Sequence, residues 1–181
     1  MSSYRFEGVI IKRHNLGETD KLVTFFTKDL GKITLKARGL RKLSSKRAGA
    51  LELFNLVRAQ AVTGKGDLDT LTEVDLVEPF SSWRTHLGRV TLAYQLCEAI
   101  DKLTPDHQPH PEIFTLLVSD LSQISLLGED WEKIMHEWLL DILRTLGFWP
   151  ENQSFSGNIN ELLEKTTDRP LHSRKLLSKL K

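Results

Sequence analysis

Hydrophobic and polar residues alternate with a period of two along most of the first 80 residues, which is the pattern of half-buried β-strands. Five short segments rich in β-branched and aromatic residues are separated by Gly, Asp and Asn turn signals: Phe6–Arg13, Lys21–Thr27, Lys32–Arg38, Leu53–Thr63 and Leu71–Val77. Five strands in this length predict a small barrel. A five-stranded Greek-key barrel of the OB type fits the count.

The third of these segments alternates most regularly. Its residues divide into Ile33, Leu35 and Ala37 on one face and Lys32, Thr34, Lys36 and Arg38 on the other. We expect the first face to lie in the core and the second to be exposed and positively charged. Phe25 and Phe26 are adjacent, so a regular strand directs them to opposite faces. One is expected in the core, and the other is a candidate platform for stacking on a base, although core packing is the commoner role.

Beyond Pro79 the hydrophobic period changes to that of helices. Helices are predicted from Trp83 to Cys97 behind the capping pair Ser81-Ser82, from Pro111 to Ser125, from Trp131 to Leu146, from Asn160 to Lys165 and from Leu171 to Leu180. The sequence therefore predicts an α+β protein of two domains. Residues 1–80 form an OB-fold nucleic-acid-binding domain, and residues 81–181 form a helical interaction domain.

Charge is distributed unevenly, although the formal net charge of the chain is only +1. Residues 1–80 hold 14 Lys and Arg against 10 Asp and Glu, whereas residues 81–150 hold 5 against 10. Residues 32–47 contain seven basic residues and no acid. Such a run creates a local field that attracts a polyanion, and nucleic acid is the first candidate. Composition alone leaves a solvated loop as an equally good explanation.

The candidate DNA-binding residues fall into two groups. Arg38, Arg41 and Lys42 flank Gly39, where the backbone can approach a phosphate closely, and guanidinium groups can bind phosphate through two hydrogen bonds. The remaining cations of the run and those near the first inter-strand loop complete the set: Lys32, Lys36, Lys46, Arg47, Lys12, Arg13 and Lys21.

The sequence lacks clear motifs for catalysis, metal binding and membrane insertion. Gly64-Lys65-Gly66 lacks the order of a phosphate loop, and His107 and His110 lie in a Pro-rich segment without thiols nearby. Glu73 and Asp75 share a strand face and are interpreted as facing solvent. The single cysteine, Cys97, is interpreted as a core residue. We therefore expect no enzyme activity, cofactor or metal, and a cytoplasmic location, since neither a signal peptide nor a membrane span is predicted.

Several strings of residues resemble those of one bacterial family. They are Gly8-Val9-Ile10-Ile11, Gly17 to Thr27, Leu30-Gly31, Lys36 to Lys42 with Ser44 or Ser45, Leu53-Phe54-Asn55-Leu56, and the carboxy-terminal Leu171-His172-Ser173-Arg174-Lys175-Leu176-Leu177. Together they resemble the bacterial DNA repair protein RecO family over nearly the whole chain. Many relatives carry a four-cysteine zinc site that this chain cannot form, and we expect a shortened form of the family.

The resemblance implies a non-catalytic recombination mediator of the RecF-type repair pathway, located at the nucleoid during repair. Such a protein binds single- and double-stranded DNA, anneals complementary strands, contacts the single-stranded-DNA-binding protein and RecR, and helps to load the RecA recombinase. The acidic helical half should repel DNA. The resemblance implies that it docks the acidic tail of the single-stranded-DNA-binding protein, which requires an apolar groove with local cations, and Arg84, Arg89 and Arg144 are the candidates. Two alternatives stay open, namely an OB module for RNA and a scaffold whose basic loop binds another protein.

Overall fold

The computed structural model describes residues 2–39, 48–64, 66 and 68–173. The chain divides into two compact units. The barrel unit consists of residues 1–80 together with residues 106–114, and the helical unit consists of residues 81–105 and 115–181. The segment 106–114 therefore packs with the strands, although helical residues precede and follow it along the chain.

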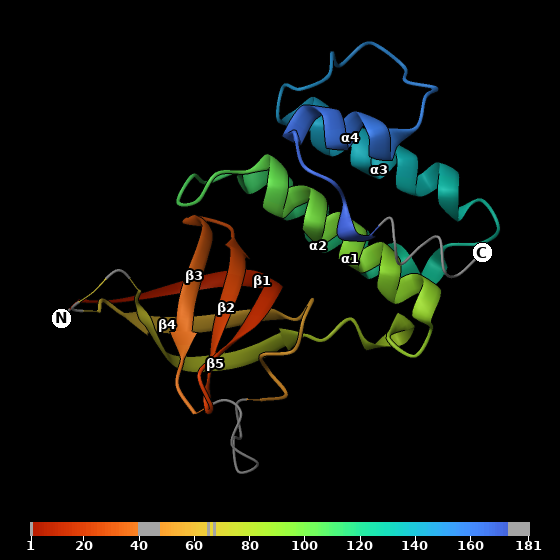
Figure 1. Cartoon of the computed structure of the whole chain (residues 1–181). Helices are drawn as coiled ribbons and strands as arrows, with labels where there is room; N and C mark the ends of the chain where they lie inside the picture. Colours follow the sequence, from red (N-terminus) through yellow and green to blue (C-terminus); the bar gives the residue numbers. More distant parts are fainter. Residues whose placement is uncertain (1, 40–47, 65, 67, 174–181) are drawn as a thin grey trace. The chain divides into compact units, whose positions relative to one another are not determined.

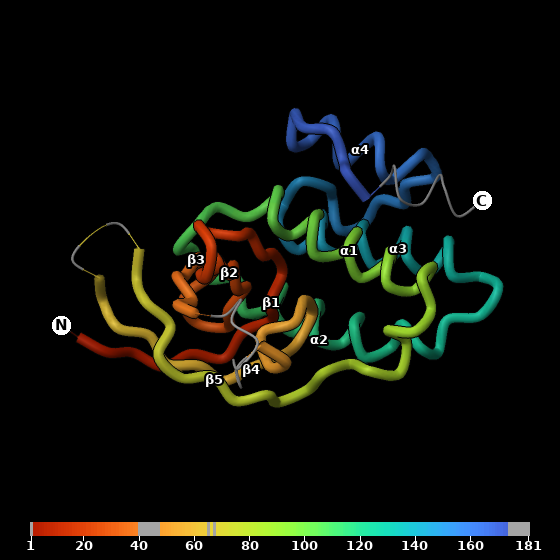
Figure 2. Tube along the Cα trace, turned by 60° about the horizontal axis from the view of Figure 1, so that its bottom comes forward, coloured from red at the N-terminus to blue at the C-terminus, as the bar shows by residue number. Residues whose placement is uncertain are grey.

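Five strands form the barrel unit: β1 (Ser3–Leu16), β2 (Asp20–Thr27), β3 (Gly31–Ala37), β4 (Leu56–Val62) and β5 (Thr70–Glu78). They close into a barrel in the order β1-β2-β3-β5-β4, which can be followed in Figures 1 and 2. All neighbours are antiparallel except β3 and β5, which meet in parallel at Lys36 and Thr70. The predicted five-stranded OB barrel followed by helices is confirmed.

The long strand β1 belongs to both sides of the barrel. Its first half, from Ser3 to Val9, pairs with β4, and its second half, from Gly8 to Leu16, pairs with β2. The register shifts between Ile10 and Lys12, as at a β-bulge. Because of this shift, Ile10 points into the barrel opposite Phe25 while Lys12 lies on the outer surface opposite Thr24.

Inward-facing residues of all five strands fill the barrel. They include Ile33, Leu35 and Ala37, as the alternation of the third strand predicts, and each is at most 3% exposed. Phe6 and Phe25 meet edge to face, with ring centroids 5.1 Å apart. This arrangement suits the quadrupoles of the two rings and adds to the free energy gained by burying them.

The entry to β4 differs from the predicted strand that begins at Leu53. Phe54 is buried with a φ of 71°, which an extended strand does not allow, and Asn55 then turns its side chain back along the chain. The Asn55 Nδ2 group donates hydrogen bonds to the carbonyl oxygens of Gly49 and Ala50, at 3.0 and 2.9 Å. The regular strand therefore begins only at Leu56.

The helical unit contains α1 (Leu87–Leu103), α3 (Trp131–Thr145), α4 (Ile159–Thr167), most of α2 (Pro111–Gln123), and two short 3₁₀ turns, η1 (Ser81–Trp83) and η2 (Ile124–Leu126). The predicted helix start at Trp83 is wrong, since Trp83 ends η1 and α1 begins at Leu87. The Trp83 indole is fully buried and donates a hydrogen bond to the carbonyl oxygen of Leu121, at 2.8 Å. The hydrogen bond satisfies the indole N–H, which has no access to water at this buried position.

Helix α1 contacts α3 and α4 in the helical unit, and it holds the start of the carboxy-terminal motif. The Glu98 carboxylate accepts hydrogen bonds from the backbone N–H groups of His172 and Ser173, at 2.7 and 2.8 Å. Leu171 is buried beside them. Residues 174–181, which contain most of the last predicted helix, lie outside the described residues.

Candidate nucleic-acid interface

The outer surface of β1, β2 and β3 carries the cations that the structure brings together. The strand registers place Lys12 beside Thr24 and Thr34 in one cross-strand row, and His14 beside Leu22 and Lys36 in the next. Lys12 and His14 are exposed, and the hydroxyl oxygens of Thr24 and Thr34 lie 2.9 Å apart. Arg38 directly follows β3 and is also exposed. We call Lys12, His14, Lys36 and Arg38 the cationic face.

An acid positions the end of the cationic face, and the sequence interpretation missed it. Lys36 Nζ lies 3.1 Å from Asp20 Oδ2, and Asp20 Oδ1 accepts a hydrogen bond from the backbone N–H of Gly39, at 2.9 Å. The Gly39 N–H, then Lys36 and Thr19, lower the pKa of Asp20 to about 2. Gly39 has a φ of 64°, so the turn that follows Arg38 depends on a glycine and on this carboxylate.

Arg13 and Lys21 occupy different positions from Lys12. Their registers place them in rows with inward-facing residues, Arg13 opposite Val23 and Lys21 opposite Ala37. The Arg13 guanidinium donates to the carbonyl oxygen of Leu51 and to a carboxylate oxygen of Glu52, both at 2.8 Å. The Arg13 side chain is 18% exposed, so its first role is to hold the loop that contains Leu51 and Glu52 against β1.

The prediction that Lys32 lies on an exposed face is wrong. Lys32 is 8% exposed, and its Nζ atom lies 3.4 Å from Asp106 Oδ1. The backbone of Asp106 bridges to Lys32 in parallel, and the His107 N–H donates to the Lys32 carbonyl oxygen at 3.0 Å. The segment that begins at residue 106 thus returns to the edge of β3 and covers this lysine.

Gly31 shows how closely that returning segment approaches the strand. A Cβ atom at Gly31 would lie 2.2 Å from the carbonyl oxygen of Gln108, which is far inside van der Waals contact. The φ of Gly31 is 69°, a conformation that side chains also disfavour. Both observations explain why glycine stands at the start of β3.

The proposed aromatic platform is not available either. Phe25 lies in the barrel core, and Phe26, on the opposite side of β2, is also fully buried. In the register, Phe26 lies between Val9 of β1 and Lys32 of β3, and both of those residues are buried too. The outer surface of these strands therefore has a covered part around Phe26 and an open part around Lys12 and Lys36.

Four of the candidate residues, Arg41, Lys42, Lys46 and Arg47, lie outside the described residues. They remain predictions from the sequence. Their nearest described neighbours are Gly39 and Ala48, and the first of these follows the cationic face directly.

The three arginines proposed for a protein partner do not share one environment. The Arg84 guanidinium lies over the Trp83 ring, 5.4 Å from its centroid, and Arg89 donates to the carbonyl oxygen of Leu127 at 3.3 Å. Both belong to the segment of η1 and the first turn of α1, which contacts η2. Exposed leucines lie in the same segments, Leu87 at 67% and Leu126 at 80% exposure.

Arg144, by contrast, is engaged by acids of its own helix. Its Nη1 atom lies 2.9 Å from Asp141 and 3.7 Å from Glu137, and its Nη2 atom donates to the carbonyl oxygen of Gln153. Arg144 therefore has a structural role within the helical unit.

Asp120, on α2, is buried, and its burial together with the charge of Asp141 raises its pKa to about 7.

Residues that could carry other chemistry are isolated from one another. Cys97 is buried in α1, and burial raises the pKa of its thiol. Within residues 2–39, 48–64, 66 and 68–173, no three His, Cys, Asp or Glu side chains come together as metal ligands would. None of the helices in this part of the chain combines the length and apolar character that crossing a bilayer requires.

The fold places the protein in the class of proteins in which an OB barrel is followed by a helical unit. Family models agree with this division, because the model described as Recombination protein O N terminal matches residues 1–80 and that described as Recombination protein O C terminal matches residues 84–170. The chain belongs to the RecO family.

Individual relatives support the assignment. The chain is 33% identical over 165 residues to the DNA repair protein RecO of Symbiobacterium thermophilum, an alignment that covers 91% of this chain and 65% of the relative. It is 34% identical over 157 residues to that of Cutibacterium acnes and 38% identical over 151 residues to that of Anaeromyxobacter dehalogenans strain 2CP-C. These alignments cover 83% of this chain in both cases, and 63% and 59% of the relatives. The chain thus spans roughly three fifths of the length of the curated relatives that it matches.

Proposed function

We propose that this protein is a DNA-binding recombination mediator in DNA repair. In this role it binds single- and double-stranded DNA, anneals complementary strands, and helps to load a recombinase onto DNA coated by the single-stranded-DNA-binding protein. The observation that carries the proposal is the cationic face on the outer surface of an OB barrel, in a chain of the RecO family. Each Lys or Arg that neutralises a phosphate releases condensed counterions, which supplies affinity without reading sequence.

The burial of the phenylalanines supports annealing in particular. Phe6, Phe25, Phe26, Phe54, Phe80 and Phe114 of the barrel unit are all buried, and the Tyr4 hydroxyl donates to Asp69. With no exposed phenylalanine among the described residues of this unit, stacking on bases contributes little. A strand held through its phosphates keeps its base edges free for pairing, which is what an annealing protein requires.

The helical unit is the proposed site for the single-stranded-DNA-binding protein. Arg84 and Arg89 lie near the exposed Leu87 and Leu126, and an acidic, apolar tail peptide needs this combination of cations and apolar surface. Arg144 is a weaker candidate, since Glu137 and Asp141 already neutralise it. Contacts with RecR, and indirectly with RecA, are proposals from the family alone. We propose no catalytic activity and no cofactor.

The test is DNA binding and strand annealing by a variant in which Lys12, Lys36 and Arg38 are changed to alanine. We expect the affinity for a single-stranded oligonucleotide to fall at least tenfold. We also expect the slope of log affinity against log salt to shrink by about 2, since each lost phosphate contact contributes about 0.7. Annealing of complementary oligonucleotides should slow in parallel. The thermal unfolding temperature should fall only slightly, because Lys12 and Arg38 are exposed and the ion pair of Lys36 with Asp20 is partly exposed to solvent.

The matched control removes three exposed cations from the helical unit: Lys133, Lys165 and Arg169 changed to alanine. Both variants lose the same charge, so a general electrostatic effect would weaken them equally. Equal losses, or unchanged annealing in the first variant, would reject the cationic face as the binding surface. Duplex DNA and RNA of the same sequence belong in the titration, because a clear preference for RNA would favour the alternative of an RNA-binding module.

A further inference from the structure

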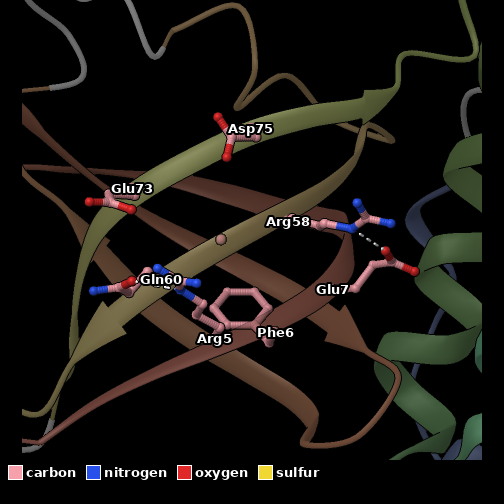
Figure 3. A pocket seen from close by; sticks show the side chains of 8 residues that line it. Arg5, Phe6, Glu7, Arg58, Gln60, Glu73 and Asp75 are labelled. Atoms are coloured by element: carbon pink, nitrogen blue, oxygen red, sulfur yellow. Dashed lines mark hydrogen bonds and ion pairs between the residues drawn. The ribbon is translucent and has the colours of Figure 1, made fainter.

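A hollow lies on the barrel, on the outer surface of β1, β4 and β5. Its volume is about 400 Å³, and its lining side chains are seen in Figure 3. We call it the trough, and it is lined by Arg5, Phe6, Glu7, Arg58, Ala59, Gln60, Glu73 and Asp75. Nothing in the proposed DNA-binding function uses these residues.

The strand registers arrange the trough as two cross-strand rows. One row runs Arg5, Gln60, Glu73, and the other runs Glu7, Arg58, Asp75. Arg5 Nε donates to Gln60 Oε1, and Arg58 Nε donates to Glu7 Oε2, each at 2.9 Å. Figure 3 shows these side chains reaching across β1 and β4, with Glu73 and Asp75 along β5. The hydrogen bonds hold both arginines beside the strands in a fixed orientation.

The two carboxylates of β5 in the trough, Glu73 and Asp75, are accessible to another molecule. Glu73 and Asp75 are exposed, and neither has a hydrogen bond or ion pair with a residue that the structure describes. They stand two positions apart on one strand, so their side chains are about 7 Å apart along β5. Leu76 and Val77, which follow on the same strand, are 46% and 41% exposed. The strand thus offers acids followed by apolar surface.

We propose that the trough binds an extended segment of a partner protein that carries arginine or lysine at alternate positions. Side chains of an extended peptide repeat about every 7 Å on one face, which matches the separation of Glu73 and Asp75. An arginine placed there forms charge-assisted hydrogen bonds with a carboxylate, and the intervening residues of the peptide point away from the trough. Phosphate is disfavoured, because Glu73 and Asp75 repel it. The proposal goes beyond DNA binding and does not depend on it.

The test uses a fluorescent peptide in which arginine and valine alternate, with the full-length protein and anisotropy as the readout. Changing Glu73 to Gln together with Asp75 to Asn should weaken the peptide about tenfold, since two charge-assisted contacts become neutral ones. The same variant should bind single-stranded DNA within about twofold of the wild type, because the trough lies outside the DNA path. Both side chains are exposed, so the fold should be retained, and circular dichroism checks this.

The control changes Asp29 to Asn together with Glu129 to Gln, two exposed acids outside the trough. It alters the net charge by the same amount and should leave the peptide affinity unchanged. An equal loss in this control, or none in the Glu73 and Asp75 variant, would overturn the proposal. So would a loss of DNA affinity after Arg5→Ala with Arg58→Ala, which would assign the trough to nucleic acid. Failure of the wild type to bind DNA would reject the proposed function and leave the peptide result standing.

Discussion

The two polar surfaces of the barrel differ in how their charges are organised. On the cationic face, Lys36 forms an ion pair with Asp20, whose carboxylate also accepts a hydrogen bond from the backbone N–H of Gly39. In the trough, three acids accompany two arginines, and the arginines are held by neighbouring side chains. Strand β1 contributes to both surfaces, since its first half pairs with β4 and its second half pairs with β2.

This difference shows why net charge is a poor guide to what a small barrel binds. Residues 1–80 contain 14 cations and 10 acids, but this total combines the positively charged cationic face with the trough, where acids outnumber arginines. A polyanion is attracted to one side and repelled from the other, so its path over the barrel is restricted. If DNA binds to the cationic face as proposed, the opposite surface remains accessible to a protein.

Reversing charge on each surface in turn gives the largest expected contrast. Lys12→Glu with Arg38→Glu should lower the affinity for single-stranded DNA about a hundredfold, because two attractive contacts become repulsive, and should reduce the salt slope by at least about 1.4. Glu73→Lys with Asp75→Lys adds the opposite charge outside the DNA path, and should raise affinity only about threefold. Anisotropy titrations at several salt concentrations measure both effects. Changes of equal size would show that the two surfaces are not distinct.

A substitution in the shared core should affect both surfaces alike. Leu35 is 1% exposed inside the barrel, and Leu35→Ala should lower the free energy of unfolding by about 3 kcal/mol through lost burial and a cavity. Denaturant unfolding measures this change. Where the variant remains folded, its affinities for DNA and for the arginine peptide should both stay within about twofold of the wild type. A selective loss of one activity would mean that the core positions that surface specifically.

The sequence predicts the strands well because their alternation has a direct physical cause. Ile33, Leu35 and Ala37 are buried as expected, since every second residue of a strand faces the same side. The same rule fails for Lys32 and Phe26, which are buried on the outer surface. Periodicity separates the two faces of a strand, but it does not show which later segment packs on the outer one.

Parts of the candidate sites depend on contacts that the sequence pattern does not contain. The acid of the cationic face, Asp20, becomes important only because the turn at Gly39 returns to it. Glu73 and Asp75 were expected on one strand face, which their spacing of two residues requires. Their neighbours Gln60 and Arg58 follow from the register of β4 against β5, and a bulge shifts that register between Gln60 and Ala61.

Removing the acid of the cationic face should have the smallest effect and a defined pH dependence. The pKa of Asp20 falls from 3.8 to about 2 in the folded protein, so its carboxylate stabilises the fold above pH 3.8, and this contribution is lost as the pH falls through about 2. Asp20→Asn should therefore lower the unfolding temperature at pH 7 and match the wild type near pH 2. It also releases Lys36, so DNA affinity should rise about twofold.

The matched carboxyl group is Asp120, whose shift has the opposite sign. Its pKa is raised to about 7 by burial and by Asp141, so the stability of its protonated form is present below pH 3.8 and is lost as the pH rises through about 7. Asp120→Asn should therefore raise the unfolding temperature at pH 8, match the wild type near pH 3, and leave DNA affinity unchanged. If both variants changed DNA affinity equally, the pairing of Asp20 with Lys36 could not be the cause.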